Sequence, residues 1–184
     1  MGKKLSSFLL KLLGWKVKFD IDPIPDKFVI AVIPHTSSWD FPLGLLVRSV
    51  MDIDVKYLGK DSLFKGPFGG LFRWLGGYPV DRSKNNNFVD TVIDIFKREE
   101  KFSTAIAPEG TRKKVDQLKT GFYYIAKGAG VPILLCKFDY AHKLVSFSDP
   151  FYPTDDTKAD FKFIDDYFRG TLGKIPENSY LYGE

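Results

Sequence analysis

Apolar residues in the chain recur with two different spacings, and segments of the two kinds alternate. Short apolar or alternating runs predict strands at residues 28–34, 54–58, 78–80, 102–107, 131–137 and 143–148. Apolar positions at helical spacing predict helices at 42–52, 85–99 and 118–129, with a C-terminal helix at 155–170. This alternation is typical of an α/β fold, in which a mostly parallel central sheet is flanked by helices.

The N-terminal segment has a different pattern. Lysines surround apolar residues at helical spacing in residues 1–18, which are too short and too charged to span a bilayer. We expect an amphipathic helix lying on a membrane surface, although the same pattern fits a helix packed on the protein's own core. The rest, residues 19–184, contains no Ser/Gly-rich linker and is predicted to form a single domain.

Composition excludes several classes of site. The chain has 184 residues with one Cys and 2 His, too few for an intramolecular disulfide or a Cys/His zinc site, so no metal or cofactor is predicted. We expect Cys136 to lie in a core strand. The net charge of +4 favours a negatively charged partner. Zinc-finger spacing and RNP-type aromatics are missing, which argues against nucleic acid, as are GxGxxG and Walker sequences for nucleotides.

The segment Pro34-His-Thr-Ser-Ser-Trp-Asp40 follows the first strong strand and precedes a helix that has Pro42 in its first turn. In such a turn the carboxylate of Asp40 can accept a hydrogen bond from one ring nitrogen of His35, which leaves the other nitrogen free to accept a proton. The spacing therefore predicts a His35–Asp40 general base. The alternative is a surface histidine beside a helix-capping aspartate.

Two further turns carry fixed cations, Gly76-Gly-Tyr-Pro-Val-Asp-Arg82 and Pro108-Glu-Gly-Thr-Arg112. With the HxxxxD turn and the later Val131-Pro-Ile133, they resemble in their order the glycerophospholipid acyltransferase family, from about residue 28 to residue 137. The carboxyl ends of parallel strands meet at one sheet edge, so we expect these turns to lie together there. Arg82 and Arg112 are predicted to grip phosphate, although each alone also fits a surface arginine.

The resemblance implies an enzyme that transfers an acyl group from acyl-CoA or acyl carrier protein, as co-substrate, to a lysophospholipid hydroxyl, such as that of 1-acyl-glycerol-3-phosphate. It adds Lys60 to the phosphate contacts and gives Glu109, Gly110 and Thr111 a place in the substrate site, with Glu109 orienting Arg112 or binding the acceptor. It also implies a cytoplasmic enzyme, peripheral on the inner face of the cell membrane.

The residues themselves suggest how transfer proceeds. No GxSxG motif is present, and Ser37 and Ser38 are expected to cap the next helix, so the acceptor hydroxyl is predicted to be the nucleophile without a covalent enzyme intermediate. Backbone amides near Gly110, or the Arg112 guanidinium, are candidates to stabilise the oxyanion.

Other functions fit parts of the same pattern. An esterase or thioesterase would use the His35–Asp40 pair on water, an acyltransferase could act on a non-phosphate aminoacyl-type lipid, and a non-catalytic protein could bind anionic lipids. Aromatic residues are abundant and could line an acyl channel or fill the core; because aromatics at helical spacing are usually core, none is assigned to the site. They include Phe64, Phe68, Phe72, Trp74, Phe122, Tyr123 and Tyr124.

Overall fold

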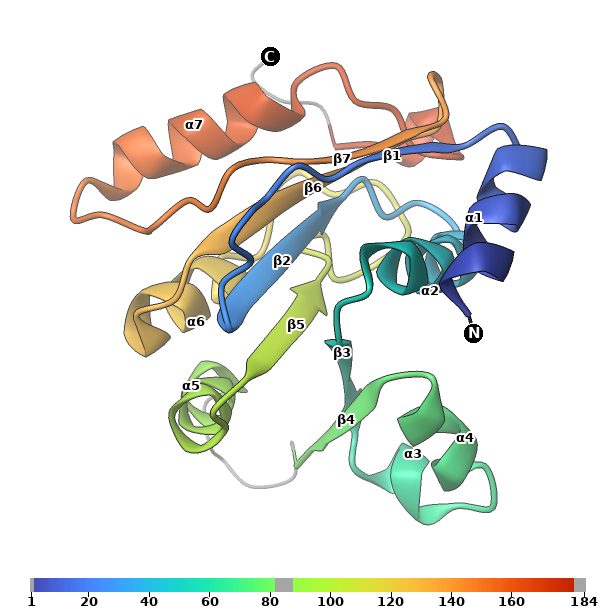
Figure 1. Cartoon of the computed structure of the whole chain (residues 1–184). Coiled ribbons are helices and arrows are strands. Elements are labelled where there is room, and N and C mark those ends of the chain that lie inside the picture. Colours follow the sequence, from blue (N-terminus) through green and yellow to red (C-terminus); the bar gives the residue numbers. More distant parts are fainter. Residues whose placement is uncertain (1, 82–87, 181–184) are drawn as a thin grey trace.

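The computed structural model describes residues 2–81 and 88–180, and it has three layers, with helices on both faces of one sheet (Figure 1). Within these residues the sheet is seven-stranded, in the order β1-β7-β6-β2-β5-β3-β4. Its strands are β1 (Lys16–Lys18), β2 (Lys27–Ile33), β3 (Val55–Lys60), β4 (Gly77–Val80), β5 (Phe102–Ile106), β6 (Ile133–Asp139) and β7 (Leu144–Phe147). The pairings from β6 to β4 are all parallel and β7 is antiparallel to β6, so the predicted mostly parallel α/β sheet is confirmed.

The helices occupy most of the segments that the apolar spacing indicates. They are α1 (Lys3–Leu12), α2 (Asp40–Met51), α3 (Ser62–Lys65), α4 (Gly69–Trp74), α5 (Phe88–Arg98), α6 (Gly121–Ala129) and α7 (Thr157–Phe168), with a short 3-10 turn at Pro176–Asn178. The sequence analysis did not predict α3 and α4, because each is too short to show a helical repeat.

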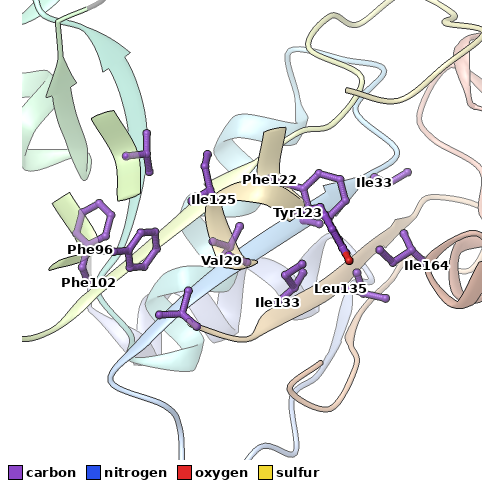
Figure 2. Close-up of a cluster of buried hydrophobic side chains, with 14 of the residues drawn as sticks. Val29, Ile33, Phe96, Phe102, Phe122, Tyr123, Ile125, Ile133, Leu135 and Ile164 are labelled. Carbon is purple, nitrogen blue, oxygen red and sulfur yellow. The ribbon is translucent and has the colours of Figure 1, made fainter. Parts of the chain in front are cut away.

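A hydrophobic core lies on each face of the sheet. On one face, side chains of β2 and β6 such as Val29 and Ile133 pack against α5, α6 and α7, which contribute residues such as Phe122 and Ile164 (Figure 2). On the other face, the alternate residues of β2 and β6 pack against α1 and α2. Burial on both faces explains why these strands read as continuous apolar runs. Cys136 is buried in the second core, as expected.

The N-terminal segment corrects one prediction, because the helix expected over residues 1–18 ends at Leu12. Gly14 has a φ of 77°, which glycine adopts readily and which ends the helix. The chain then extends, and Lys16–Lys18 forms β1, parallel to β7. This edge strand was not predicted, since its short length hides the alternation of side chains. Leu10 packs into the core, so residues 1–18 are joined to the domain rather than separate from it.

The carboxyl ends of the parallel strands meet at one edge of the sheet, as predicted. His35 follows β2, Lys60 ends β3, Glu109 follows β5, and Tyr140 follows β6. Residues separated by up to about half of the chain are thereby brought to the same edge. The described residues of the sequence motifs therefore lie on this edge of the sheet.

Close packing inside the α3–α4 hairpin generates a stability prediction. A Cβ atom on Gly69 would lie 2.2 Å from the Phe64 carbonyl oxygen, whereas a Cβ on Gly70, in the same helix, would meet nothing within 4 Å. Gly69→Ala should therefore lower the free energy of unfolding by about 1–3 kcal/mol. Gly70→Ala, the matched control, should raise it by up to about 1 kcal/mol through helix propensity. Urea denaturation measures both, and equal effects would contradict this packing.

Candidate functional site

His35 and Asp40 form a close pair in the turn between β2 and α2. The Nδ1 atom of His35 lies 3.0 Å from Oδ2 of Asp40, and their side chains are 30% and 3% exposed. Asp40 is the first residue of α2, so the helix start holds its carboxylate inside the fold while the imidazole remains accessible. Because Nδ1 is engaged, Nε2 is the ring nitrogen left to exchange a proton with a substrate.

Two further donors hold the Asp40 carboxylate. The backbone N–H of Ser37 donates to Oδ2 at 2.9 Å, and the Tyr140 hydroxyl donates to Oδ1 at 2.6 Å. Burial acts to raise the pKa of Asp40, but the hydrogen bonds from His35, Tyr140 and Ser37 outweigh it, and the net pKa is below the ordinary value. Asp40 is therefore a carboxylate at neutral pH.

Tyr140 is suited to remain a donor in this arrangement. Burial and the hydrogen bond to Asp40 raise the pKa of its hydroxyl well above the ordinary value, so it stays protonated. Its ring packs edge-on against Trp15, with the ring centroids 4.8 Å apart. The sequence analysis did not find Tyr140, although its place three residues after a predicted strand that ends at the same sheet edge was a usable signal.

Glu109 supports His35 from the neighbouring strand end. Its Oε1 accepts a hydrogen bond of 2.8 Å from the backbone N–H of His35. The side chain is buried, which raises the pKa of the carboxyl above its ordinary value, and Oε2 has no hydrogen-bond partner among the described residues. Glu109 therefore fixes the main chain that carries the imidazole.

The next residue, Gly110, sits in a left-handed turn with a φ of 63°. Its N–H already donates to the Ala107 carbonyl at 3.0 Å. The Gly110 amide is thus occupied, and an oxyanion would have to use other donors of this turn.

No side chain near His35 is set up as an enzyme nucleophile in the part of the chain that the structure describes. The Ser37 hydroxyl accepts from the Trp39 N–H at 3.2 Å, and Ser38 is exposed. Neither serine caps α2 through its side chain, so that expectation was wrong; Trp39 is the cap residue, and Ser37 closes the turn before it. Cys136 is fully buried, and burial raises the pKa of its thiol well above the ordinary value.

An apolar cavity of about 200 Å³ opens beside His35, between α2 and the strands β2, β3 and β5. Most of its lining is aliphatic or aromatic, including Leu45, Tyr57 and Phe138. Arg48 also lines the cavity, where its guanidinium donates to the Leu75 carbonyl at 3.0 Å and pairs with Asp54. A space of this composition suits a hydrocarbon chain next to the imidazole.

A second cavity, of about 630 Å³, contains His35 as well and extends along the turn after β5. Lys119 is the one Lys or Arg that lines it within the described ranges, and no carboxylate there lies within ion-pair distance of it. The lysine side chain lies across Gly110, since a Cβ on this glycine would meet Nζ at 2.5 Å. Sequence reasoning missed Lys119 because no pattern in the sequence marks a lysine seven residues past the Pro108–Arg112 turn as part of the site.

The cations predicted from sequence lie less centrally. Lys60 and Arg112 are exposed, at the end of β3 and in the turn after β5, and neither lines a cavity that contains His35. The hydroxyl of Thr111, in the same turn, accepts from the backbone N–H of Lys113 at 3.3 Å. Arg82 is outside the described residues. Phosphate binding by these side chains stays a prediction.

Aromatic residues divide between the core and the surface. Phe64, Phe122 and Tyr123 are buried as expected, but Phe68, Trp74 and Tyr124 are exposed, which corrects the expectation of a mostly internal set. Over residues 2–81 and 88–180, no helix has the length and apolar character needed to cross a membrane. The same residues contain no cluster of His, Cys, Asp or Glu arranged to hold a metal ion.

Comparison with known proteins assigns the family. The family model described as Acyltransferase matches residues 16–137, which include the turns of His35 and Glu109. The structure is similar to the crystal structure of the 1-acyl-sn-glycerophosphate (LPA) acyltransferase PlsC from Thermotoga maritima, with a TM-score of 0.62 at 18% identity, over 90% of this chain and 74% of that one. No protein with a curated description matches the sequence. The matched model covers well over half of the chain, which therefore belongs to the acyltransferase family.

Proposed function

We propose that the protein is an O-acyltransferase that moves a fatty acyl chain from an acyl-CoA or acyl-carrier-protein thioester to the hydroxyl of a lysophospholipid such as 1-acyl-glycerol-3-phosphate. The observation that carries the proposal is the His35–Asp40 pair, 3.0 Å apart, at the mouth of an apolar cavity. Among the described residues, the Ser37 hydroxyl accepts a hydrogen bond inside its own turn and Cys136 is fully buried, and no serine hydroxyl pairs with the imidazole. The hydroxyl of the acceptor therefore supplies the missing member of the triad.

In the proposed reaction, Nε2 of His35 takes the proton of the acceptor hydroxyl as its oxygen attacks the thioester carbonyl. Asp40 stabilises the imidazolium that forms and keeps the ring in one tautomer. The carbon–sulfur bond then breaks, and His35 returns the proton to the departing thiolate. Ester and free thiol are the products, and no bond to the enzyme forms at any stage.

The two cavities suit the two substrates. The apolar cavity beside His35 would hold the acyl chain of the donor and keep water away from the thioester. The larger cavity along the β5 turn would receive the polar end of the acceptor, with its phosphate near Lys119 and within reach of Arg112. With this division, the acceptor hydroxyl would lie between the two cavities, at the imidazole.

Association with the inner face of the cell membrane is part of the proposal. Although Leu10 anchors α1 on the core, Leu5, Phe8 and Leu12 remain exposed on it at a spacing of three and four residues. These positions form one stripe, and the exposed Lys4 and Lys11 lie together along one side of it. An apolar stripe bordered by lysines suits the boundary between anionic headgroups and acyl chains.

The function is tested by incubating the pure protein with a labelled acyl thioester and a panel of lysolipids, and identifying the acylated product by mass. His35→Ala should fold normally, and its rate of acyl transfer should fall by about a hundredfold or more, because the general base is gone. A folded, fully active His35→Ala protein would exclude this mechanism. Acyl release to water that no lysolipid in the panel suppresses would favour the hydrolase alternative.

Tyr140→Phe tests the support of the dyad. Losing one hydrogen bond to a charged group should lower kcat by about tenfold and leave the KM of both substrates nearly unchanged. The carboxylate then has one donor fewer, so the Asp40 pKa rises and the carboxylate holds the imidazolium more strongly. The acid limb of the pH–rate profile should move to higher pH. Glu109 is another ionisable group that faces the pair, and this substitution leaves it unchanged.

Tyr152→Phe removes a hydroxyl from an exposed tyrosine away from the His35–Asp40 pair, and it serves as the control. An unmoved acid limb would leave Tyr140 with a packing role only.

Substitution of Lys119 tests the acceptor site. Lys119→Gln should raise the apparent KM for a phosphate-bearing acceptor by about tenfold, because a charged hydrogen bond is lost, and should affect donor hydrolysis less. Arg112→Gln should act in the same direction. An acyl-pantetheine donor is used, because it lacks the nucleotide phosphates of CoA. Lys114→Gln, an exposed lysine that lines neither cavity, is the control. Acceptor kinetics that respond equally to all three substitutions would remove Lys119 from the acceptor site.

A further inference from the structure

The hairpin of α3 and α4, here called the α3–α4 lobe (residues 61–75), exposes large apolar side chains that have no place in the core. Leu63, Phe68, Leu71 and Trp74 are 50%, 64%, 49% and 68% exposed. Single exposed apolar residues are common, but a group of this size in so short a segment marks an interaction surface.

The base of the lobe is well packed, so the exposure is not the result of a loose hairpin. Phe64 is 3% exposed and lies against Gly59 and Gly77. Arg73 donates to the Phe64 carbonyl at 3.0 Å, and the Tyr57 hydroxyl donates to the Phe72 carbonyl at 3.2 Å. With the inner side filled, the four apolar side chains point outward from a fixed support.

Charge on the lobe itself is mainly positive. Lys60 precedes it, and Lys65 and Arg73 lie on it, all three exposed. Asp61, the one acid of residues 60–75, already pairs with Lys65. Aromatic and aliphatic side chains interspersed with such cations match a surface that offers negative charge above a hydrocarbon layer.

The lobe lies on the same side of the molecule as the start of α1. It projects from the β3–β4 edge of the sheet (Figure 1), and a cavity of about 690 Å³ between the two elements is lined by Lys3 on one side and by Trp74 on the other. Leu75, the next residue, also lines the apolar cavity that contains His35. The start of α1 and the end of the lobe therefore line one cavity, next to the apolar cavity that contains His35.

We propose that the α3–α4 lobe docks on an anionic phospholipid bilayer, as a second contact beside α1. The inference rests on the proposed function, in which the acceptor resides in that bilayer. A second copy of the chain is a poorer occupant, because a stable interface takes about 20–30 residues from each partner and the lobe is much smaller. Docking at two places fixes the orientation of the enzyme, whereas α1 alone leaves rotation about one helix free.

Sedimentation with vesicles of phosphatidylcholine, with and without phosphatidylglycerol, measures the contact in the absence of substrates. Phe68→Ser/Trp74→Ser should reduce partitioning into anionic vesicles by about tenfold or more, at an unchanged unfolding midpoint. Tyr124→Ser/Tyr152→Ser is the matched control, because these aromatics are similarly exposed, 49% and 58%, but lie outside the lobe. Tyr124 is on α6, and Tyr152 follows β7. The control should bind like the unchanged protein.

The apolar contribution should persist at high salt, while Lys60→Gln/Lys65→Gln, which leaves the Arg73 contact with Phe64 in place, should matter only at low salt. Equal vesicle binding by the Phe68/Trp74 variant and the unchanged protein overturns the proposal. A second outcome also overturns it. If light scattering finds a dimer, and the Phe68/Trp74 variant abolishes the dimer without a loss of vesicle binding, the lobe is a self-association surface.

A separate readout keeps this test apart from the proposed function. With a short-chain, monomeric lysophosphatidate in solution, the Phe68/Trp74 variant should turn over like the unchanged protein, because the lobe contacts no reacting group. If the unchanged protein binds vesicles through the lobe yet transfers no acyl chain to any lysolipid, the function is wrong and the docking surface stands.

Discussion

The site depends on one buried charge, the carboxylate of Asp40. An ionised carboxyl is stable inside a protein only where hydrogen bonds replace the water it has lost. Here three donors come from two segments: the imidazole of His35 and the backbone of Ser37 in the turn before α2, and the hydroxyl of Tyr140 after β6. Satisfying the carboxylate therefore ties the turn after β2, the start of α2 and the turn after β6 together, and it aligns the imidazole as a consequence.

Sequence reasoning reached the local part of this arrangement and missed the remote part, for a physical reason. His35 and Asp40 are five residues apart, so the geometry of one turn brings them together. Tyr140 and Asp40 are separated by 100 positions, and Glu109 and His35 by 74. Such contacts follow from the strand order of the sheet, which alternating strands and helices do not specify. The predicted sheet edge was right, but which side chains meet on it depends on that order.

The same distinction explains the errors in the fold. Long, doubly buried strands such as β2 and β6 were easy to predict, since both of their faces are apolar. The edge strand β1 and the short helices α3 and α4 have no periodic pattern, and they are defined by what they pack against. Phe68 and Trp74 were expected in the core because aromatic residues usually are buried. They are exposed because Phe64 and Phe72 already occupy the base of the hairpin.

The contacts of Trp15 connect α1 to the His35–Asp40 pair. Trp15 follows α1 and packs edge-on against Tyr140, which in turn holds Asp40. The next three residues form β1, so removing the N-terminal segment would also remove an edge strand and the support of Tyr140. Loss of activity after such a truncation would not separate docking from catalysis. Substitutions confined to the exposed stripe of α1 leave Leu10, Trp15 and β1 in place, so the carboxylate keeps all of its donors and a loss of vesicle binding can be assigned to the stripe alone.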